Sequence, residues 1–172
     1  ARENISISIS NFDALDAVSN MAIRPAIHLK LDTGMHRQGF LGSDMNRLMA
    51  FMKKKHIAPE GVFTHFASAK DAAHPAYTLA QLASFKEYTS MIEAAGFSPM
   101  IRHAAATGGT LLFPDAHLDM VRIGMGLYGY WPSEEAKNGK REREHKEREI
   151  RMRLKPVLTW KTIIAETKRI PK

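Results

Sequence analysis

Lys30 and Arg37 are the first residues of this 172-residue chain whose types and spacing suggest chemistry. Lys30 stands in the apolar stretch AIHLKLD (26–32), which has the composition of a buried strand. A buried ammonium group is costly unless a partner neutralises it or a reaction uses it. The turn DTG follows directly, and Arg37 comes seven residues after the lysine. Lys30 therefore needs a functional partner, unless its stem lies in the core while its head group reaches water.

Further polar side chains of unusual kind stand near the ends of the later strand-like stretches. They are His65, His103, Thr107 and Arg122, with Gly124 just after the last. In parallel β/α folds, functional side chains sit at the carboxyl ends of the strands and in the turns that follow. A polar residue near almost every strand end therefore predicts a single site at that edge.

The elements that must position these residues alternate between strands and helices. Five stretches have the apolar content or the alternation of strands: 5–10, 26–32, 61–68, 100–107 and 119–124. The segments between them predict three amphipathic helices and one short turn of helix: 11–22, 43–55, 78–96 and 109–113. This alternation favours an α/β fold with βαβ units and a parallel sheet, either a small open sheet or an arc of a barrel.

The expected helix ends carry recognisable signals. Asn11 or Asp13 is expected to cap the first helix and Ser43 the second, while Gly96 suits the position after the third. The face that the first helix buries is expected to hold Leu15, Val18 and Met21.

Composition excludes several classes of protein. Cysteine is absent, which excludes disulfides and thiolate metal sites, and His65 and His74 are too far apart for a helical ligand pair, so no metal is expected. No apolar run approaches the roughly 20 residues of a membrane span, and the start of the chain lacks the pattern of a signal peptide. We therefore expect a cytoplasmic protein.

Much of the formal charge of +7 lies in the segment 134–155, which holds nine Lys or Arg and six Glu. Opposite charges recur there at i,i+4 spacing, as on a solvated helix: Glu142/Lys146, Glu144/Arg148 and Glu149/Arg153. No aromatic residue among them could stack on bases. We expect an exposed helix or loop and no nucleic-acid partner. A nucleic-acid binder would instead show binding that falls steeply with salt.

The pattern changes after Trp131. The stretch PVLTWKTIIAETKRI (156–170) alternates like a strand, and no helix follows it. We therefore divide the chain into a partial β/α barrel at 1–130, a charged linker at 131–155 and the start of a β-rich domain at 156–172.

Four motifs resemble the alanine racemase family in their order and spacing: KLDTGMHRQGF, FTHFA, HAAATG and DMVRIGMGLYG. The tail LKPVLTWKT resembles the point where the barrel of that family joins its β domain. The resemblance implies a pyridoxal 5′-phosphate enzyme with a (β/α)8 barrel, working as a head-to-tail homodimer. It implies interconversion of L- and D-alanine, which supplies D-alanine for peptidoglycan precursors.

The resemblance also implies roles for the first site residues. The family often carries, at the position of Lys30, a lysine carbamylated by CO2, whose anion orients the arginine matching Arg37. Arg37 is then expected to contact the phenolic oxygen of the cofactor and the carboxylate of the amino-acid substrate. His65 resembles the histidine that packs against the pyridine ring and links to a tyrosine of the other subunit. The alternative is a core histidine bonded to a backbone carbonyl.

The later motifs imply how the rest of the cofactor is bound. His103 is expected to bond Arg122, and Arg122 is expected to face the pyridine nitrogen. A cation there keeps the nitrogen unprotonated, which favours racemisation over transamination. Thr107, Gly124 and Met125 match the phosphate-binding residues, through a hydroxyl and backbone N–H groups.

Two features leave alternatives open. Ala106 stands where the family commonly has asparagine, which removes one polar contact near the cofactor and leaves a serine or broad-specificity racemase as an alternative. The family also uses two bases, a Schiff-base lysine and a tyrosine of the opposite subunit, and neither is matched in this chain. The motifs begin at what resembles the fourth β/α unit, so we expect the middle of a racemase. A non-catalytic half-barrel that binds the cofactor is the other alternative.

We predict that this chain alone neither racemises alanine nor holds pyridoxal phosphate covalently, because no lysine, Lys30 included, matches the Schiff-base position. Treatment with borohydride followed by mass spectrometry tests this. A stoichiometric phosphopyridoxyl adduct on any single lysine would contradict the prediction.

Overall fold

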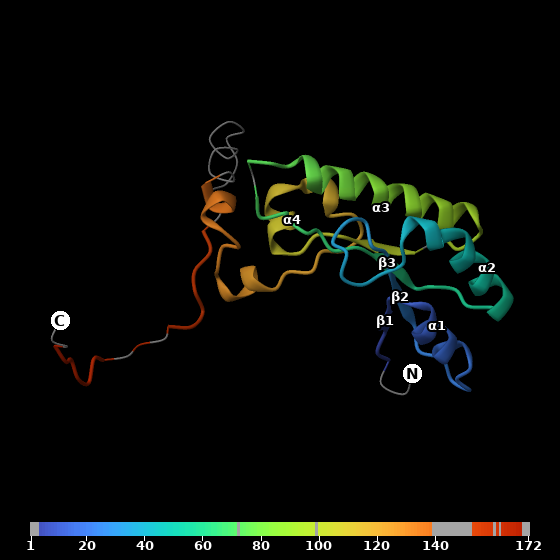
Figure 1. Cartoon of the computed structure of the whole chain (residues 1–172), viewed down its shortest axis with the longest axis horizontal. Coiled ribbons are helices and arrows are strands. Elements are labelled where there is room, and N and C mark those ends of the chain that lie inside the picture. Colours follow the sequence, from blue (N-terminus) through green and yellow to red (C-terminus); the bar gives the residue numbers. More distant parts are fainter. Residues whose placement is uncertain are drawn as a thin grey trace.

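The computed structural model describes residues 4–71, 73–98, 100–138, 153–159, 161 and 163–169. Four parallel strands form one sheet in which each strand pairs with its neighbour in sequence (Figure 1). They are β1 (Ile7–Ile9), β2 (Ile27–Lys30), β3 (Gly61–Phe63) and β4 (Ile101–His103). An order without reversal is that of a barrel arc, whereas a doubly wound open sheet changes direction at a switch point. The predicted parallel β/α architecture is confirmed.

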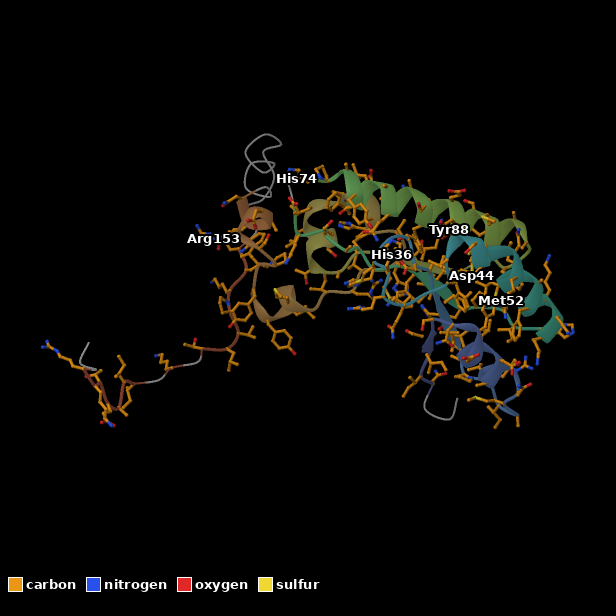
Figure 2. All side chains as sticks on the ribbon, in the orientation of Figure 1. His36, Asp44, Met52, His74, Tyr88 and Arg153 are labelled. Atoms are coloured by element: carbon orange, nitrogen blue, oxygen red, sulfur yellow. The ribbon has the colours of Figure 1, made fainter. Side chains whose placement is uncertain are left out.

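Helices connect the strands. The α-helices are α1 (Phe12–Ser19), α2 (Met45–Lys55), α3 (Ala76–Ala94) and α4 (Thr107–Leu112), and the 3-10 turns are η1 (Gly42–Asp44), η2 (Pro114–Ala116) and η3 (Met125–Tyr128). Helix α3 runs along one side of the sheet with α2 beside it (Figure 1). Met52 of α2 and Tyr88 of α3 mark these two neighbouring helices in Figure 2.

The two faces of the sheet differ because successive strand residues point to opposite sides. One face supplies Ile9, Leu29 and Val62 to the apolar core, where helix residues such as Leu15, Leu48 and Leu82 join them. The other face carries a different kind of side chain. Lys30, Phe63 and His103 lie opposite one another in register at the carboxyl ends of β2, β3 and β4. The strands therefore separate a buried apolar layer from a polar inner surface.

The helix ends confirm some predictions and correct others. The Asn11 side chain accepts a hydrogen bond from the Ala14 N–H at 2.8 Å, as an N-cap does. Gly96 follows α3 with a φ of +95°, as predicted. Ser43 is not the cap of α2, because it lies inside η1, where the Asp44 carboxylate instead accepts from the Leu41 N–H. Met21 is exposed because α1 ends at Ser19.

The predicted fifth strand at 119–124 is wrong as a strand. Only one isolated parallel bridge forms there, between Ala106 and Arg122, with the Arg122 N–H donating to the Ala105 carbonyl at 2.9 Å. Asp119 on one side is bound to the Arg102 backbone and guanidinium, and the turn at Gly124 follows on the other. These two constraints leave one residue in register with β4. The stretches 61–68 and 100–107 likewise contain strands of only three residues.

The structure tests the predictions for the C-terminal part of the chain at only some positions. Residues 134–138 are helical, and the predicted i,i+4 pairs beyond them lie outside the described residues. The described residues from 156 onward form no strand and are exposed. The Val157 N–H donates to the Tyr128 carbonyl at 3.2 Å. The linker and the start of a β domain stay predictions. Among the described residues, none of the helices combines the length and the apolar character of a membrane span.

Replacing Leu29 with alanine is expected to destabilise the chain by about 2–5 kcal/mol, because this fully buried side chain lies in the central layer between sheet and helices. Urea denaturation followed by circular dichroism measures the change. The matched control is Leu127→Ala, since Leu127 is 69% exposed, and it should change stability by less than about 0.5 kcal/mol. Equal unfolding midpoints for the two variants would contradict the proposed core.

Candidate active site

The loop after β2 closes on itself and presents Arg37. The Asp32 N–H donates to the Phe40 carbonyl at 2.8 Å, and the Phe40 N–H donates to the Lys30 carbonyl at 2.9 Å. Gly39 permits this closure with a φ of +128°, and a Cβ there would lie 2.7 Å from the Asp32 nitrogen. Arg37 lies on the exposed part of the loop, next to His36, which Figure 2 labels.

Lys30 is buried, with 8% of its surface exposed. Its Nζ lies 3.5 Å from Gln38 Oε1, and within the described part of the chain it makes no ion pair with a carboxylate. The nearby Asp32 carboxylate instead accepts from the Gly34 and His36 N–H groups at 2.9 and 3.0 Å. Burial lowers the pKa of Lys30, the charge of Arg37 lowers it further, and Asp32 only partly opposes this.

Arg122 is the centre of the site. Its Nη1 donates to His103 Nδ1 at 2.7 Å, and its Nη2 donates to the Thr64 and Ala104 carbonyls at 2.8 and 3.0 Å. His65 Nδ1 lies 3.4 Å from the same Nη2. These acceptors are carbonyl oxygens and imidazole nitrogens, which carry no negative charge, so they do not cancel the positive charge of the guanidinium. The sequence-based prediction that His103 bonds Arg122 agrees with this geometry.

The surroundings of both histidines favour the neutral imidazole. Burial lowers the pKa of His103 to about 4, and the charge of Arg122 adds to the effect. Burial also lowers the pKa of His65, and Arg122, Arg37 and Lys30 add to it. Neutral imidazole can accept a hydrogen bond from arginine, whereas imidazolium cannot. The cations and the neutral histidines of the site therefore depend on one another.

Thr107 begins α4 and is buried. Its Oγ1 accepts from the N–H groups of Gly124 and Gly126 at 3.3 and 3.2 Å. The structure thus brings Thr107 and Gly124 together, as expected, and adds Gly126, which the sequence reasoning missed although the spacing G-M-G was a signal. Met125 lies between the two glycines and begins η3. A Cβ at Gly126 would lie 3.0 Å from Thr107 Cγ2.

The two glycines of α4 allow close packing rather than a tight turn. A Cβ at Gly108 would lie 3.0 Å from the Ala69 carbonyl oxygen, and one at Gly109 would lie 3.3 Å from the Phe66 ring. A hollow of about 270 Å³ adjoins this contact, with His65, Ala106 and Lys70 among its lining residues.

Gln81 was also missed by sequence reasoning. It is 2% exposed, its Oε1 accepts from the Ala67 N–H at 2.9 Å, and its Nε2 donates to the His65 carbonyl at 3.4 Å. This α3 side chain therefore holds the loop that carries His65. An amide at a core position of a helix was the available signal, because buried polar groups need partners.

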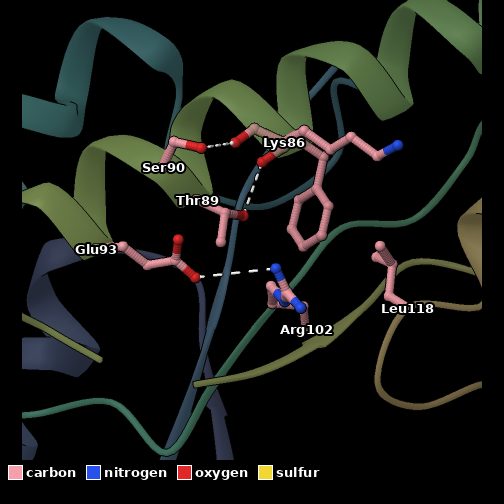
Figure 3. Close-up of a pocket in the computed structure, with 7 residues that line it drawn as sticks. Lys86, Thr89, Ser90, Glu93, Arg102 and Leu118 are labelled. Carbon is pink, nitrogen blue, oxygen red and sulfur yellow. Dashed lines mark hydrogen bonds and ion pairs between the residues drawn. The ribbon is translucent and has the colours of Figure 1, made fainter. Parts of the chain in front are cut away.

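A second hollow, of about 240 Å³, lies on the helix side of the sheet between α3 and β4 (Figure 3). Its arginine, Arg102, is already paired with Asp119 at 2.8 Å and with Glu93 at 4.0 Å, so it offers no free charge. Across the described ranges, no group of three histidine or acidic side chains could hold a metal ion.

The arrangement at the strand ends is suited to an anion. The charges of Lys30, Arg37 and Arg122 all act on His65, and the charges of the two arginines act on Lys30. Among the described residues, the one carboxylate beside them is that of Asp32, and it is held by backbone N–H groups. A ligand with several negative groups would find uncompensated positive charge here.

Comparison with known proteins assigns the family. Residues 1–132 match the model of the alanine racemase N-terminal domain. The chain is 37% identical over 161 residues to an alanine racemase of Leptospira interrogans, covering 94% of this chain and 40% of that protein. It is 38% identical over 150 residues to that of Symbiobacterium thermophilum, covering 83% and 34%. It thus spans about 40% of the length of the relatives it matches.

Solved structures agree with this result. The alanine racemase of Streptomyces coelicolor A3(2) matches with a TM-score of 0.73 and 32% identity, over 81% of this chain and 39% of that one. The Bacillus anthracis alanine racemase with bound L-Ala-P matches with a TM-score of 0.74 and 26% identity, over 91% and 39%. With its parallel β/α arc and the site at its strand ends, this chain belongs to the alanine racemase family.

Proposed function

We propose that the protein containing this chain is a pyridoxal-phosphate-dependent racemase that interconverts L- and D-alanine, in the cytoplasm and as a head-to-tail homodimer. The observation that carries the proposal is the cluster of Lys30, Arg37 and Arg122 without a free carboxylate among the described residues. Alanine is favoured over serine because the relatives named above are alanine racemases. No residue of this chain matches either catalytic base, so both would come from other segments of the dimer.

The donor groups fit pyridoxal phosphate. Thr107 has a hydroxyl on which two backbone N–H groups converge, and we assign the phosphate to this hydroxyl and to the backbone of Gly124 and Met125. We assign the ring to His65 and the pyridine nitrogen to Arg122, which keeps its full charge. The cofactor, when bound, supplies the electron sink that lets the substrate α-carbon lose its proton.

The residues of the chain would act mainly by position and charge. Arg122 is held by carbonyls of Thr64 and Ala104 and by neutral His103, so its charge is fixed in place. A permanent cation disfavours a proton on a neighbouring ring nitrogen. Arg37, on the exposed side of the site, would bind the substrate carboxylate.

Lys30 would be carbamylated or would face a bound anion. The ammonium group would first lose one proton. The neutral amine would then attack the carbon of CO2, one C=O π bond would open onto oxygen, and the nitrogen would release a second proton, so that a cation becomes an anion. The lowered pKa of Lys30 makes the reactive amine available, and Arg37 and Arg122 stabilise the product charge. The change also removes the cost of an unpaired buried ammonium group.

The first experiment replaces Arg122 with glutamate in the protein that contains this chain. Loss of the cation should slow alanine racemisation by about tenfold or more and should raise transamination relative to racemisation. The two rates are measured as D-alanine and pyruvate formed from L-alanine. The matched control is Arg47→Glu, because Arg47 is an exposed residue of α2, a helix outside the site at the strand ends. If a folded Arg122→Glu protein kept the same ratio of transamination to racemisation, the assignment of Arg122 to the ring nitrogen would be wrong.

The second experiment supplies 13C-labelled CO2 and observes the carbamate carbon by NMR. One signal is expected, and it should vanish in Lys30→Ala but persist in Lys86→Ala, whose lysine is exposed. At constant dissolved CO2 the occupancy should rise with pH, since only the unprotonated amine reacts. The lowered pKa of Lys30 shifts this rise below the pH at which an ordinary lysine reacts. If no carbamate signal forms and no anion binds beside Lys30, the assignment is wrong.

A further inference from the structure

A line of polar side chains leads from Arg122 away from the strand ends. His103 Nε2 lies 2.8 Å from His28 Nδ1, and His28 Nε2 lies 3.1 Å from Glu60 Oε2. The Ser6 hydroxyl donates to the same Glu60 oxygen. Together with the bond between Arg122 and His103, these contacts connect the site to a partly exposed carboxylate. None of the roles assigned above uses His28, Glu60 or Ser6.

The chemistry of the end groups determines where every proton in this line lies. Arginine only donates, so His103 Nδ1 must accept, and the proton of neutral His103 must be on Nε2. That N–H donates to His28 Nδ1, so the proton of His28 is on its Nε2, where it donates to the Glu60 carboxylate. Moving the proton of His103 to Nδ1 would place two N–H groups against each other at the 2.7 Å contact with Arg122. Moving the proton of His28 to Nδ1 would do the same at the 2.8 Å contact between the two rings.

The backbone makes room for this line. Gly61 of β3 pairs in register with His28 on one side and with Ile101 on the other. A Cβ at Gly61 would lie 2.5 Å from His28 Nδ1 and Cε1, and 2.7 Å from the Ile101 carbonyl oxygen. The imidazole of His28 therefore occupies the space that a side chain at this position would fill. His103 is further fixed by stacking on Phe63, with ring centroids 4.9 Å apart and planes at 7°.

The line also crosses the sheet in a definite direction. Glu60 immediately precedes β3 and Ser6 immediately precedes β1, so both lie at the amino ends of the strands. His103 is the last residue of β4 and Arg122 lies beyond it. The Glu60 carboxylate, at the amino ends of the strands, is thus connected through the rings of His28 and His103 to the Arg122 guanidinium at the carboxyl ends.

We propose that His28, Glu60 and Ser6 are positioning residues that fix the Nε2–H tautomer of His103 and thereby hold the Arg122 guanidinium at the site. Glu60 orients His28, His28 accepts from His103, and His103 is left with its lone pair toward Arg122. The importance of this for the cofactor nitrogen rests on the function proposed above. The tautomers themselves do not, because they follow from the side chains of this chain alone.

The test is 15N NMR of the full chain labelled in histidine, without cofactor. His103 and His28 should each show a protonated, pyrrole-type Nε2 and an unprotonated, pyridine-type Nδ1. In His28→Phe the acceptor of the His103 Nε2–H is lost. The ratio of the Nε2–H tautomer of His103 to its Nδ1–H tautomer is therefore expected to fall about fivefold or more. His28→Gln retains an acceptor oxygen and should preserve the His103 tautomer. His74→Gln is the matched control, since the exposed His74 ring, which Figure 2 labels, pairs with Asp71 and takes part in none of the contacts of the line.

Gly61→Ala provides a second route that removes none of the polar groups. The added methyl should displace the His28 ring and change the His103 signals as His28→Phe does. The proposal would be overturned by the wild-type spectrum alone if His103 were protonated on Nδ1. It would also be overturned if the ratio of the two His103 tautomers were unchanged in folded His28→Phe or in folded Gly61→Ala. The expected spectra do not depend on racemase activity, because they are recorded without cofactor. An inactive protein with these spectra would contradict only the proposed function, and other spectra would contradict only this inference.

Discussion

The charge of Arg122, a half-buried side chain whose acceptors do not neutralise it, is the constraint on which the rest of the site depends. A carboxylate partner would be the usual way to bury a guanidinium. Here two carbonyls and one imidazole accept from three of its N–H groups while its charge persists. This requires His103 to be neutral, and burial together with the charge of Arg122 lowers its pKa to about 4. The cation and the neutral ring each make the other stable in this form.

The fold supplies these acceptors through the geometry of strand ends. The carbonyls of Thr64 and Ala104 come one residue after β3 and β4, where the ladder has ended and carbonyl groups are released from pairing. Arg122 reaches them because its N–H donates to the Ala105 carbonyl, within the single parallel bridge between Ala106 and Arg122. A continuous strand was not needed, since a single bond fixes the position of the side chain. The turn at Gly124 can then begin at once and bring its N–H to Thr107.

The sequence predicted the parts of this structure that depend on local patterns. Alternating apolar residues gave the strands and helices, and the polar residues after them gave the edge at which the site lies. Strand lengths were overestimated, because whether residues such as those at 64–68 continue a ladder depends on neighbouring strands that no local pattern reveals. The bond from Arg122 to His103 came from resemblance to a family. The partners of His103 beyond it did not, because the contact between His28 and His103 joins residues 75 positions apart.

Lys30, which is buried, and Arg122, which is half-buried, show how two desolvated cations can require different solutions. Both lose hydration on burial, and in both cases burial lowers the pKa. Arginine stays charged in any case, so its surroundings must provide acceptors, and those acceptors must be held in one protonation state. Lysine can give up its proton, and the approach of Arg37 and Arg122 favours that loss. Gln38, at 3.5 Å, gives the amine only a weak acceptor. The site therefore combines one charge that is permanent with one that its environment can remove, and a negative group beside the arginines is most easily created at Lys30.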